Sequence, residues 1–154
     1  MTKAPTLDQL CTFRLGPLYL AIGVLNVREV LHHLEITPVP HAHHAVEGLI
    51  NLRGQVATTI DLRRRLGIPE RDRDVKPIHV VVLSDGEPVT LLVDAIGDVL
   101  DVDSFTYEDP PPTMSEQARE LIMGAYKLNS ELLLALDVAK VVDLYPSSIE
   151  PVEI

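Results

Sequence analysis

Apolar residues occur along this chain mainly in short runs, and residues typical of turns separate the runs. Runs of this kind lie on both sides of Gly16-Pro17, Gly54, Asp85-Gly86 and Asn129, which predicts four hairpins. The strands expected around the first and third of these turns are 12–15 with 18–22, and 78–83 with 89–93. The pattern is therefore that of a mainly β protein.

Helical segments are few, and each follows a side chain that can accept hydrogen bonds from free backbone amides. Asp61 precedes a helix predicted over 62–66, Ser115 opens one over 115–123, and Asp137 precedes one over 138–144. Polar and proline-rich composition marks 69–77 and 109–115 as connections.

The two halves of the chain repeat one another. Gly48, Asp61 and Leu62 meet Gly124, Asp137 and Val138 at an offset of 76 residues, and Val24, Val27 and Glu29 meet Val93, Ile96 and Asp98 at an offset of 69. Each half has the same order of expected elements: a strand, a turn, a second strand, a capping Asp and a short helix. We therefore expect one domain over 12–144, with copies at 12–68 and 77–144 and tails at 1–11 and 145–154.

Short strands with little helix favour closed sheets, because closure removes exposed strand edges. The expected fold is mainly β, with a pair of small antiparallel barrels, one from each copy. A few short helices complete it.

Composition narrows the classes of partner. The chain has 154 residues and a formal net charge of -10, which argues against nucleic acid or direct membrane contact and favours basic partners. Its apolar runs are too short to span a bilayer. Cys11 is the single cysteine, and with no secretory signal it indicates a reducing, cytoplasmic location.

Charged residues are unevenly spread. Basic residues gather between Arg53 and Lys76, including Arg63 to Arg65, which we expect to form the solvated face of a helix. Acidic residues gather between Asp98 and Glu120. The two regions are expected to prefer different partner surfaces.

Catalytic signatures are absent from the sequence: there is no P-loop, dinucleotide-binding turn or nucleophile elbow. No enzymatic activity and no cofactor are therefore expected. The cluster of His41, His43 and His44 leaves a metal-dependent enzyme as an alternative to an exposed polar loop. We expect His79, in a valine-rich strand, to be hydrogen-bonded or at a sheet edge.

Two charges within apolar surroundings suggest a pair. Arg53 is expected at or beside a hairpin bend, where a carboxylate partner would hold its side chain in place. Glu29 is an isolated charge in an apolar stretch, and an Arg–carboxylate fork would accommodate both side chains.

Several motifs together resemble the CheW-like domain family of chemotaxis coupling proteins. They cover most of the chain, and the most specific one is the segment Asn51-Leu52-Arg53-Gly54 followed by Ile60-Asp61-Leu62-Arg63. Residues 22–31, 92–100 and 133–138 are also similar to that family.

The resemblance implies a mainly β fold of two small SH3-like five-stranded β-barrels around a shared hydrophobic core. It also implies a non-enzymatic adaptor that couples the cytoplasmic tips of methyl-accepting chemoreceptors to the histidine kinase CheA. By family analogy, a groove between the barrels accepts the receptor helix. The candidate receptor-binding residues are Val27, Glu29, Asn51, Leu52, Arg53, Gly54 and Val99. The regulatory domain of the kinase would bind barrel end to barrel end, at candidate positions Val80, Val82 and Leu91.

The chain departs from the family pattern at three places. Ala57-Thr58-Thr59 replaces an apolar residue and a proline, His43 replaces a proline, and Asn129-Ser130 replaces an Asp-Gly turn. Partner choice therefore stays open between receptor arrays and a parallel, non-chemotaxis kinase pathway. The regulatory domain of a kinase is a further alternative, which the short leader after Met1 disfavours.

Overall fold

The computed structural model describes residues 9–32, 34–72, 74–103 and 105–145. Its strands are β1 (Gln9–Leu15), β2 (Leu18–Gly23), β3 (Val27–His32), β4 (Val46–Leu52), β5 (Gln55–Asp61), β6 (Ile78–Ser84), β7 (Glu87–Val93), β8 (Ala95–Asp101), β9 (Thr106–Glu108), β10 (Ile122–Lys127) and β11 (Leu132–Leu136). The helices are α1 (Leu62–Leu66), α2 (Glu116–Leu121) and α3 (Val138–Val142), with a 3-10 turn, η1 (Val24–Asn26). All four expected hairpins are confirmed.

The three helices begin where the sequence predicts and end earlier in two cases. The side chains of Asp61, Ser115 and Asp137 each accept a hydrogen bond from a backbone amide of the first turn. The prediction that α2 reaches residue 123 is wrong, because the chain enters β10 at Ile122, and α3 ends at Val142 rather than at 144. No helix in the described part of the chain is long and apolar enough to cross a membrane.

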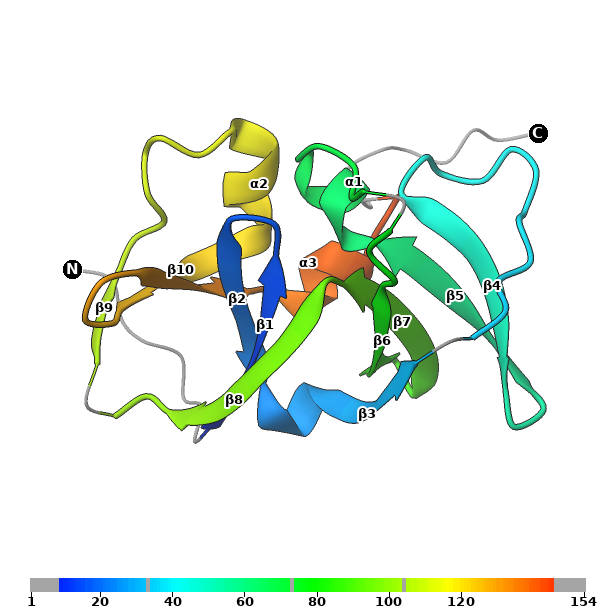
Figure 1. Cartoon of the computed structure of the whole chain (residues 1–154), viewed down its shortest axis with the longest axis horizontal. Coiled ribbons are helices and arrows are strands. Elements are labelled where there is room, and N and C mark those ends of the chain that lie inside the picture. Colours follow the sequence, from blue (N-terminus) through cyan, green and yellow to red (C-terminus); the bar gives the residue numbers. More distant parts are fainter. Residues whose placement is uncertain (1–8, 33, 73, 104, 146–154) are drawn as a thin grey trace.

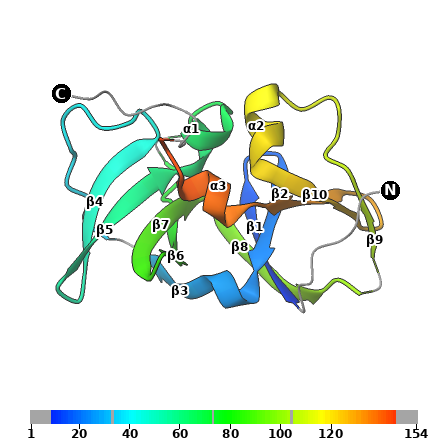
Figure 2. The ribbon, with the colours of Figure 1, turned by 180° about the vertical axis from the view of Figure 1, so that it is seen from behind.

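The strands form two sheets that lie side by side (Figure 1). One has six strands in the order β8-β1-β2-β11-β10-β9, and the other has five in the order β3-β6-β7-β5-β4. The mainly β fold with two sheets and few short helices is confirmed. Seen from behind, α3 lies between the two sheets on the face opposite β8 (Figure 2).

The sheets do not follow the two sequence copies. The first hairpin of the chain, β1–β2, belongs to the sheet that otherwise comes from the second half, while β6–β7 belongs to the sheet of β3, β4 and β5. The expectation that copies 12–68 and 77–144 each form a barrel of their own is therefore wrong. The two copies exchange their first hairpins instead.

The exchange obeys the internal repeat. β2 pairs in parallel with β11 at Leu20 and Leu134, and β7 pairs in parallel with β5 at Val89 and Thr58. These are equivalent positions, because Leu20 and Val89 are 69 residues apart and Thr58 and Leu134 are 76 apart. The duplication seen in the sequence is thus also a repeat of elements and of strand register.

Hairpin exchange explains why the central strands are so apolar. Along β11, Leu134 and Leu136 join one large core, which also holds Phe13, Ile60 and Val93 and so joins both sheets. The intervening residues Leu133 and Ala135 face a second cluster within the six-stranded sheet. A strand buried on both faces reads as a continuous apolar run rather than an alternating one. The core expected to be common to both units is confirmed.

Candidate functional site

The site begins at the tight turn between β4 and β5. Arg53 and Gly54 have φ angles of 52° and 88°, both in the left-handed region, and Leu52 pairs with Gln55 across the turn. Two central residues with positive φ suit a two-residue hairpin, and glycine adopts this backbone without steric cost. The Asn51 side-chain oxygen accepts a hydrogen bond from the Gly54 amide at 2.7 Å. The predicted bend at Arg53-Gly54 is confirmed.

Arg53 pairs with Glu29, as the sequence suggests. Its guanidinium donates two hydrogen bonds to the Glu29 carboxylate, at 2.9 and 3.0 Å, and the carboxylate raises the pKa of Arg53. The Arg53 side chain is 75% exposed and that of Glu29 only 21%. Most of the guanidinium therefore remains accessible to a partner.

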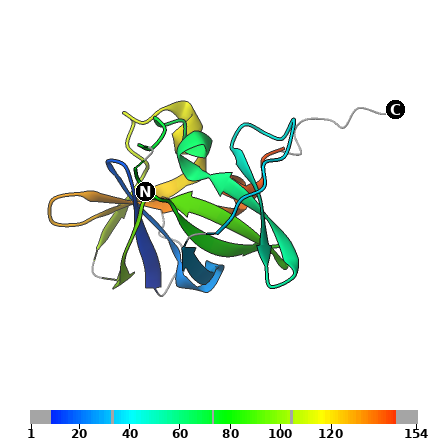
Figure 3. The ribbon, with the colours of Figure 1, turned by 45° about the vertical axis from the view of Figure 1, so that its right-hand side comes forward.

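This fork joins the two edges of the five-stranded sheet. Glu29 lies on β3 and Arg53 follows β4, which are the first and last strands of that sheet. Two edge strands meet through one side-chain pair only if the sheet curls round, which is how a small barrel closes. The β4–β5 hairpin that carries Arg53 extends from this sheet at the end away from the six-stranded sheet (Figures 1 and 3). Glu29, Leu52 and Arg53 also line a small surface cavity of about 150 Å³.

The second sheet supplies the remaining candidate receptor residue. Val99 lies on β8, an edge strand, is 52% exposed and pairs with Cys11 of β1. Val27 is partly buried and packs against the shared core. The structure therefore divides the seven candidates between the two sheets: Val27, Glu29, Asn51, Leu52, Arg53 and Gly54 on one, and Val99 on the other.

Two further apolar residues near this region are exposed, and the sequence did not indicate them as candidates. Leu25 in η1 is 95% exposed, and Ile96 on β8 is 43% exposed. The register brings η1 close to β8, because Leu10 of β1 pairs with Gly23 on one side and with Leu100 on the other. In the sequence both residues belong to ordinary apolar runs, and only the 3-10 turn and the strand edge reveal that they face solvent.

The candidate kinase-binding residues are not on the surface. Val80, Val82 and Leu91 are at most 2% exposed and form part of the shared core. Their strands, β6 and β7, lie inside the five-stranded sheet rather than at its edge. The prediction that these side chains contact a partner is therefore wrong for this conformation.

The arginine run after Asp61 is also not a solvated face. Arg63 pairs with Asp94 at 2.5 Å, and Arg65 donates hydrogen bonds to the carbonyl oxygens of Lys140 and Val141 at the end of α3, both at 2.8 Å. These residues hold α1 against β7 and α3. Arg63 is paired with a carboxylate and Arg65 is hydrogen-bonded to carbonyl oxygens, so the expected basic surface is weaker than the sequence suggests.

Asp94 is the centre of this network. Its carboxylate accepts hydrogen bonds from Arg63, from Arg71 at 3.3 Å and from the Gly16 amide at 2.7 Å. Burial alone would raise the pKa of Asp94, but these hydrogen bonds outweigh burial and lower it. One carboxylate thus ties the β1–β2 turn to α1 and to the linker between the copies.

The described histidines form no metal-binding cluster. No group of three or more His, Cys, Asp or Glu side chains among the described residues could hold a metal ion. The His43 Nδ1 accepts a hydrogen bond from the Ala45 amide, and the ring lies edge-on to Tyr145. His79 is on β6, between β3 and β7, so the expected edge position is wrong. The side chain is 2% exposed, and its Nδ1 has no hydrogen-bond partner in the described part of the protein.

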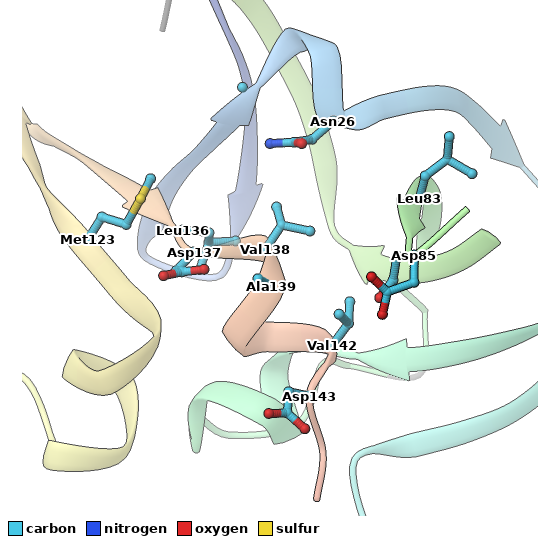
Figure 4. A pocket seen from close by; sticks show the side chains of 12 residues that line it. Asn26, Leu83, Asp85, Met123, Leu136, Asp137, Val138, Ala139, Val142 and Asp143 are labelled. Carbon is cyan, nitrogen blue, oxygen red and sulfur yellow. The ribbon is translucent and has the colours of Figure 1, made fainter. Parts of the chain in front are cut away.

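A larger cavity lies elsewhere, where the two sheets meet beside α3 (Figure 4). Its volume is about 760 Å³. None of the seven candidate receptor residues is among the described residues that line it. The candidate receptor residues therefore lie outside this cavity.

Comparison with known proteins agrees with this architecture of two joined β units. The family model of the CheW-like domain matches residues 9–145. The "Chemotaxis protein CheW" of Rhizobium meliloti (strain 1021) is 30% identical over 133 residues, covering 86% of this chain and 86% of that protein. The protein of the same name from Thermotoga maritima is 31% identical over 135 residues, covering 88% and 87%.

A solved structure is similar over nearly the same extent. The scaffolding protein TtCheW from Thermoanaerobacter tengcongensis superposes with a TM-score of 0.77 at 27% sequence identity, covering 88% of this chain and 92% of that one. The fold and its relatives define the class as chemotaxis scaffold proteins. Within that class, the chain belongs to the CheW-like domain family.

Proposed function

We propose that this protein is a non-enzymatic, cytoplasmic adaptor that couples chemoreceptor tips to the histidine kinase CheA. The observation that carries the proposal is the exposed Arg53–Glu29 fork at the closure of the five-stranded sheet. A guanidinium that a carboxylate holds in place, and that remains accessible, suits recognition of a partner helix.

The receptor surface combines this fork with the apolar side chains of both sheets. Val27 and Val99, together with the exposed Leu25 and Ile96, supply apolar contacts, while Asn51 holds the turn in place. Large apolar side chains that solvent reaches on two neighbouring elements are typical of a protein-binding surface. Leu52 and Gly54 complete the turn that presents Arg53.

The kinase would bind end to end through a regulatory domain of the same family. Val80, Val82 and Leu91 shape the interior of the barrel that is presented to it and make no direct contact. Such an adaptor changes kinase activity only through its different affinities for the two signalling states of the receptor–kinase complex.

Co-sedimentation tests the proposal with a receptor cytoplasmic fragment and a kinase regulatory domain, each alone and both together. We expect binding to each, and a complex that contains all three. Binding to neither would overturn the proposed function.

A matched pair of variants tests the receptor surface. Arg53→Ala should weaken binding of the receptor fragment without lowering the melting temperature. Arg14→Ala is the control, because Arg14 forms a fork of the same geometry with Glu131 on the other sheet, at 2.7 and 2.9 Å, with 43% of its side chain exposed against 75% for Arg53. Equal binding by the two variants would contradict the assignment of Arg53.

A further inference from the structure

The cavity beside α3 is a separate feature of the surface. Apolar side chains of Leu83, Met123, Val138 and Val142 contribute to its wall, and Figure 4 shows Val138 between Asp137 and Asp85. Helix α3, which supplies Val138 and Val142, lies on the face opposite β8 (Figures 1 and 2), while Asn26 of η1, next to Leu25, also lines the cavity.

Because of the internal repeat, the first copy contains elements that correspond to those around this cavity. Helix α1 occupies the same position in the first copy as α3 does in the second, and its capping residue Asp61 corresponds to Asp137. There, Arg71 from the linker after α1 donates hydrogen bonds to both carboxylate oxygens of Asp61, at 3.3 and 3.4 Å. The first copy thus covers its capping aspartate with an arginine of its own chain.

The second copy has the aspartate, but no arginine among the described residues covers it. The Oδ1 of Asp137 accepts a hydrogen bond from the Lys140 amide at 3.2 Å, and the side chain is partly exposed. Asp85 and Asp143 also line the cavity, and no Lys or Arg occurs among its described lining residues. Residues 143–154, which follow α3, contain no Lys or Arg, whereas 67–77 contain three.

We propose that the cavity beside α3 binds an arginine-bearing, partly apolar segment of a partner protein. The guanidinium lies on Asp137 as Arg71 lies on Asp61, and the apolar side chains of the segment cover Leu83, Val138 and Val142. The three aspartates and the net charge of -10 favour a basic segment electrostatically. The surface is additional to the proposed receptor and kinase contacts and does not depend on them.

A peptide titration tests the proposal. The probe is a short, acetylated and amidated synthetic peptide of leucine, alanine and arginine, added to the ¹⁵N-labelled full-length protein and followed by amide chemical shifts. We expect shifts gathered at Leu83 to Asp85 and at Asp137 to Asp143. The same peptide with citrulline in place of arginine should bind about tenfold more weakly, because it lacks the charge that strengthens the hydrogen bond.

Two variants separate the site from general attraction to an acidic protein. Asp137→Asn removes the charge but keeps a side chain able to cap α3, and should weaken peptide binding by about tenfold. Asp98→Asn removes one charge on the opposite face and should leave the affinity unchanged. Equal weakening by both variants would overturn the proposal, as would shifts spread over the acidic surface or no shifts at all.

A second copy of this chain is the other occupant that the experiment detects. Dilution of the protein without peptide would then move the same amide signals. Amide signals that do not change with protein concentration support a different protein as the partner. Signals at Asp137 to Asp143 that change with concentration overturn the proposal, because they show self-association.

Discussion

Gly54 offers a direct test of the turn that presents Arg53. Its φ of 88° is in the left-handed region, and a Cβ placed there meets nothing within 4 Å. The cost of Gly54→Val is therefore conformational rather than steric, about 1–2 kcal/mol of the free energy of unfolding. For a chain of 154 residues this lowers the melting temperature by about 2–8 °C.

Gly86 provides a matched control. It follows Asp85 in the β6–β7 turn with a φ of 81°, and a Cβ there also meets nothing within 4 Å. Gly86→Val should cost the same free energy as Gly54→Val, but only Gly54→Val should weaken binding of the receptor fragment. The two turns are alike in backbone and differ in their place relative to the proposed receptor surface.

Urea unfolding followed by far-ultraviolet circular dichroism measures both variants, since the chain has no tryptophan for fluorescence. Wild-type stability in both would show that the positive φ carries no cost. A loss above about 4 kcal/mol in either variant would show a steric clash that the open surroundings exclude.

Three further predictions concern the interior. Burial lowers the pKa of His79, so on acidification His79 is protonated in the unfolded chain before it is protonated in the folded protein. The free energy of unfolding should therefore fall as the pH drops below 6.5. Urea titrations at several pH values should show a weaker fall in His79→Leu, and an unchanged slope would contradict this assignment. Asp94→Ala should cost about 2–4 kcal/mol in a urea titration, because it leaves Arg63 without its carboxylate; wild-type stability would show that the network is dispensable. Gly124→Ala should cost about 1–3 kcal/mol, since its Cβ would meet the Tyr107 ring, and calorimetry would refute this if the melting temperature were unchanged.

Local signals in the sequence predicted the elements well. Each capping residue, Asp61, Ser115 and Asp137, lies where the structure begins a helix. Turn residues placed all four hairpins correctly. At Gly16, Arg53-Gly54 and Asp85-Gly86 the turn has positive φ angles, which few residue types accept. The pairing of Arg53 with Glu29 also followed from a local argument, since a charge in an apolar run needs a partner.

Surface exposure was harder to predict. Val80, Val82 and Leu91 resemble the exposed Val99 in type and in strand context, yet they lie in the shared core. The reason is that their strands are covered on both faces, while β8 is an edge strand. Neither the spacing of apolar residues nor the composition of a strand distinguishes a central strand from an edge strand when both are apolar.

The amino-acid sequence by itself determined the elements of this protein, their duplication and the family to which the chain belongs, because these depend on local backbone preferences and on residues in fixed order. Tertiary structure alone decided that the copies exchange their first hairpins and that Arg63 and Arg65 serve the interior. It also decided that Asp61 is covered by an arginine and Asp137 is not. Such features depend on contacts between residues far apart in the chain, which no local pattern records.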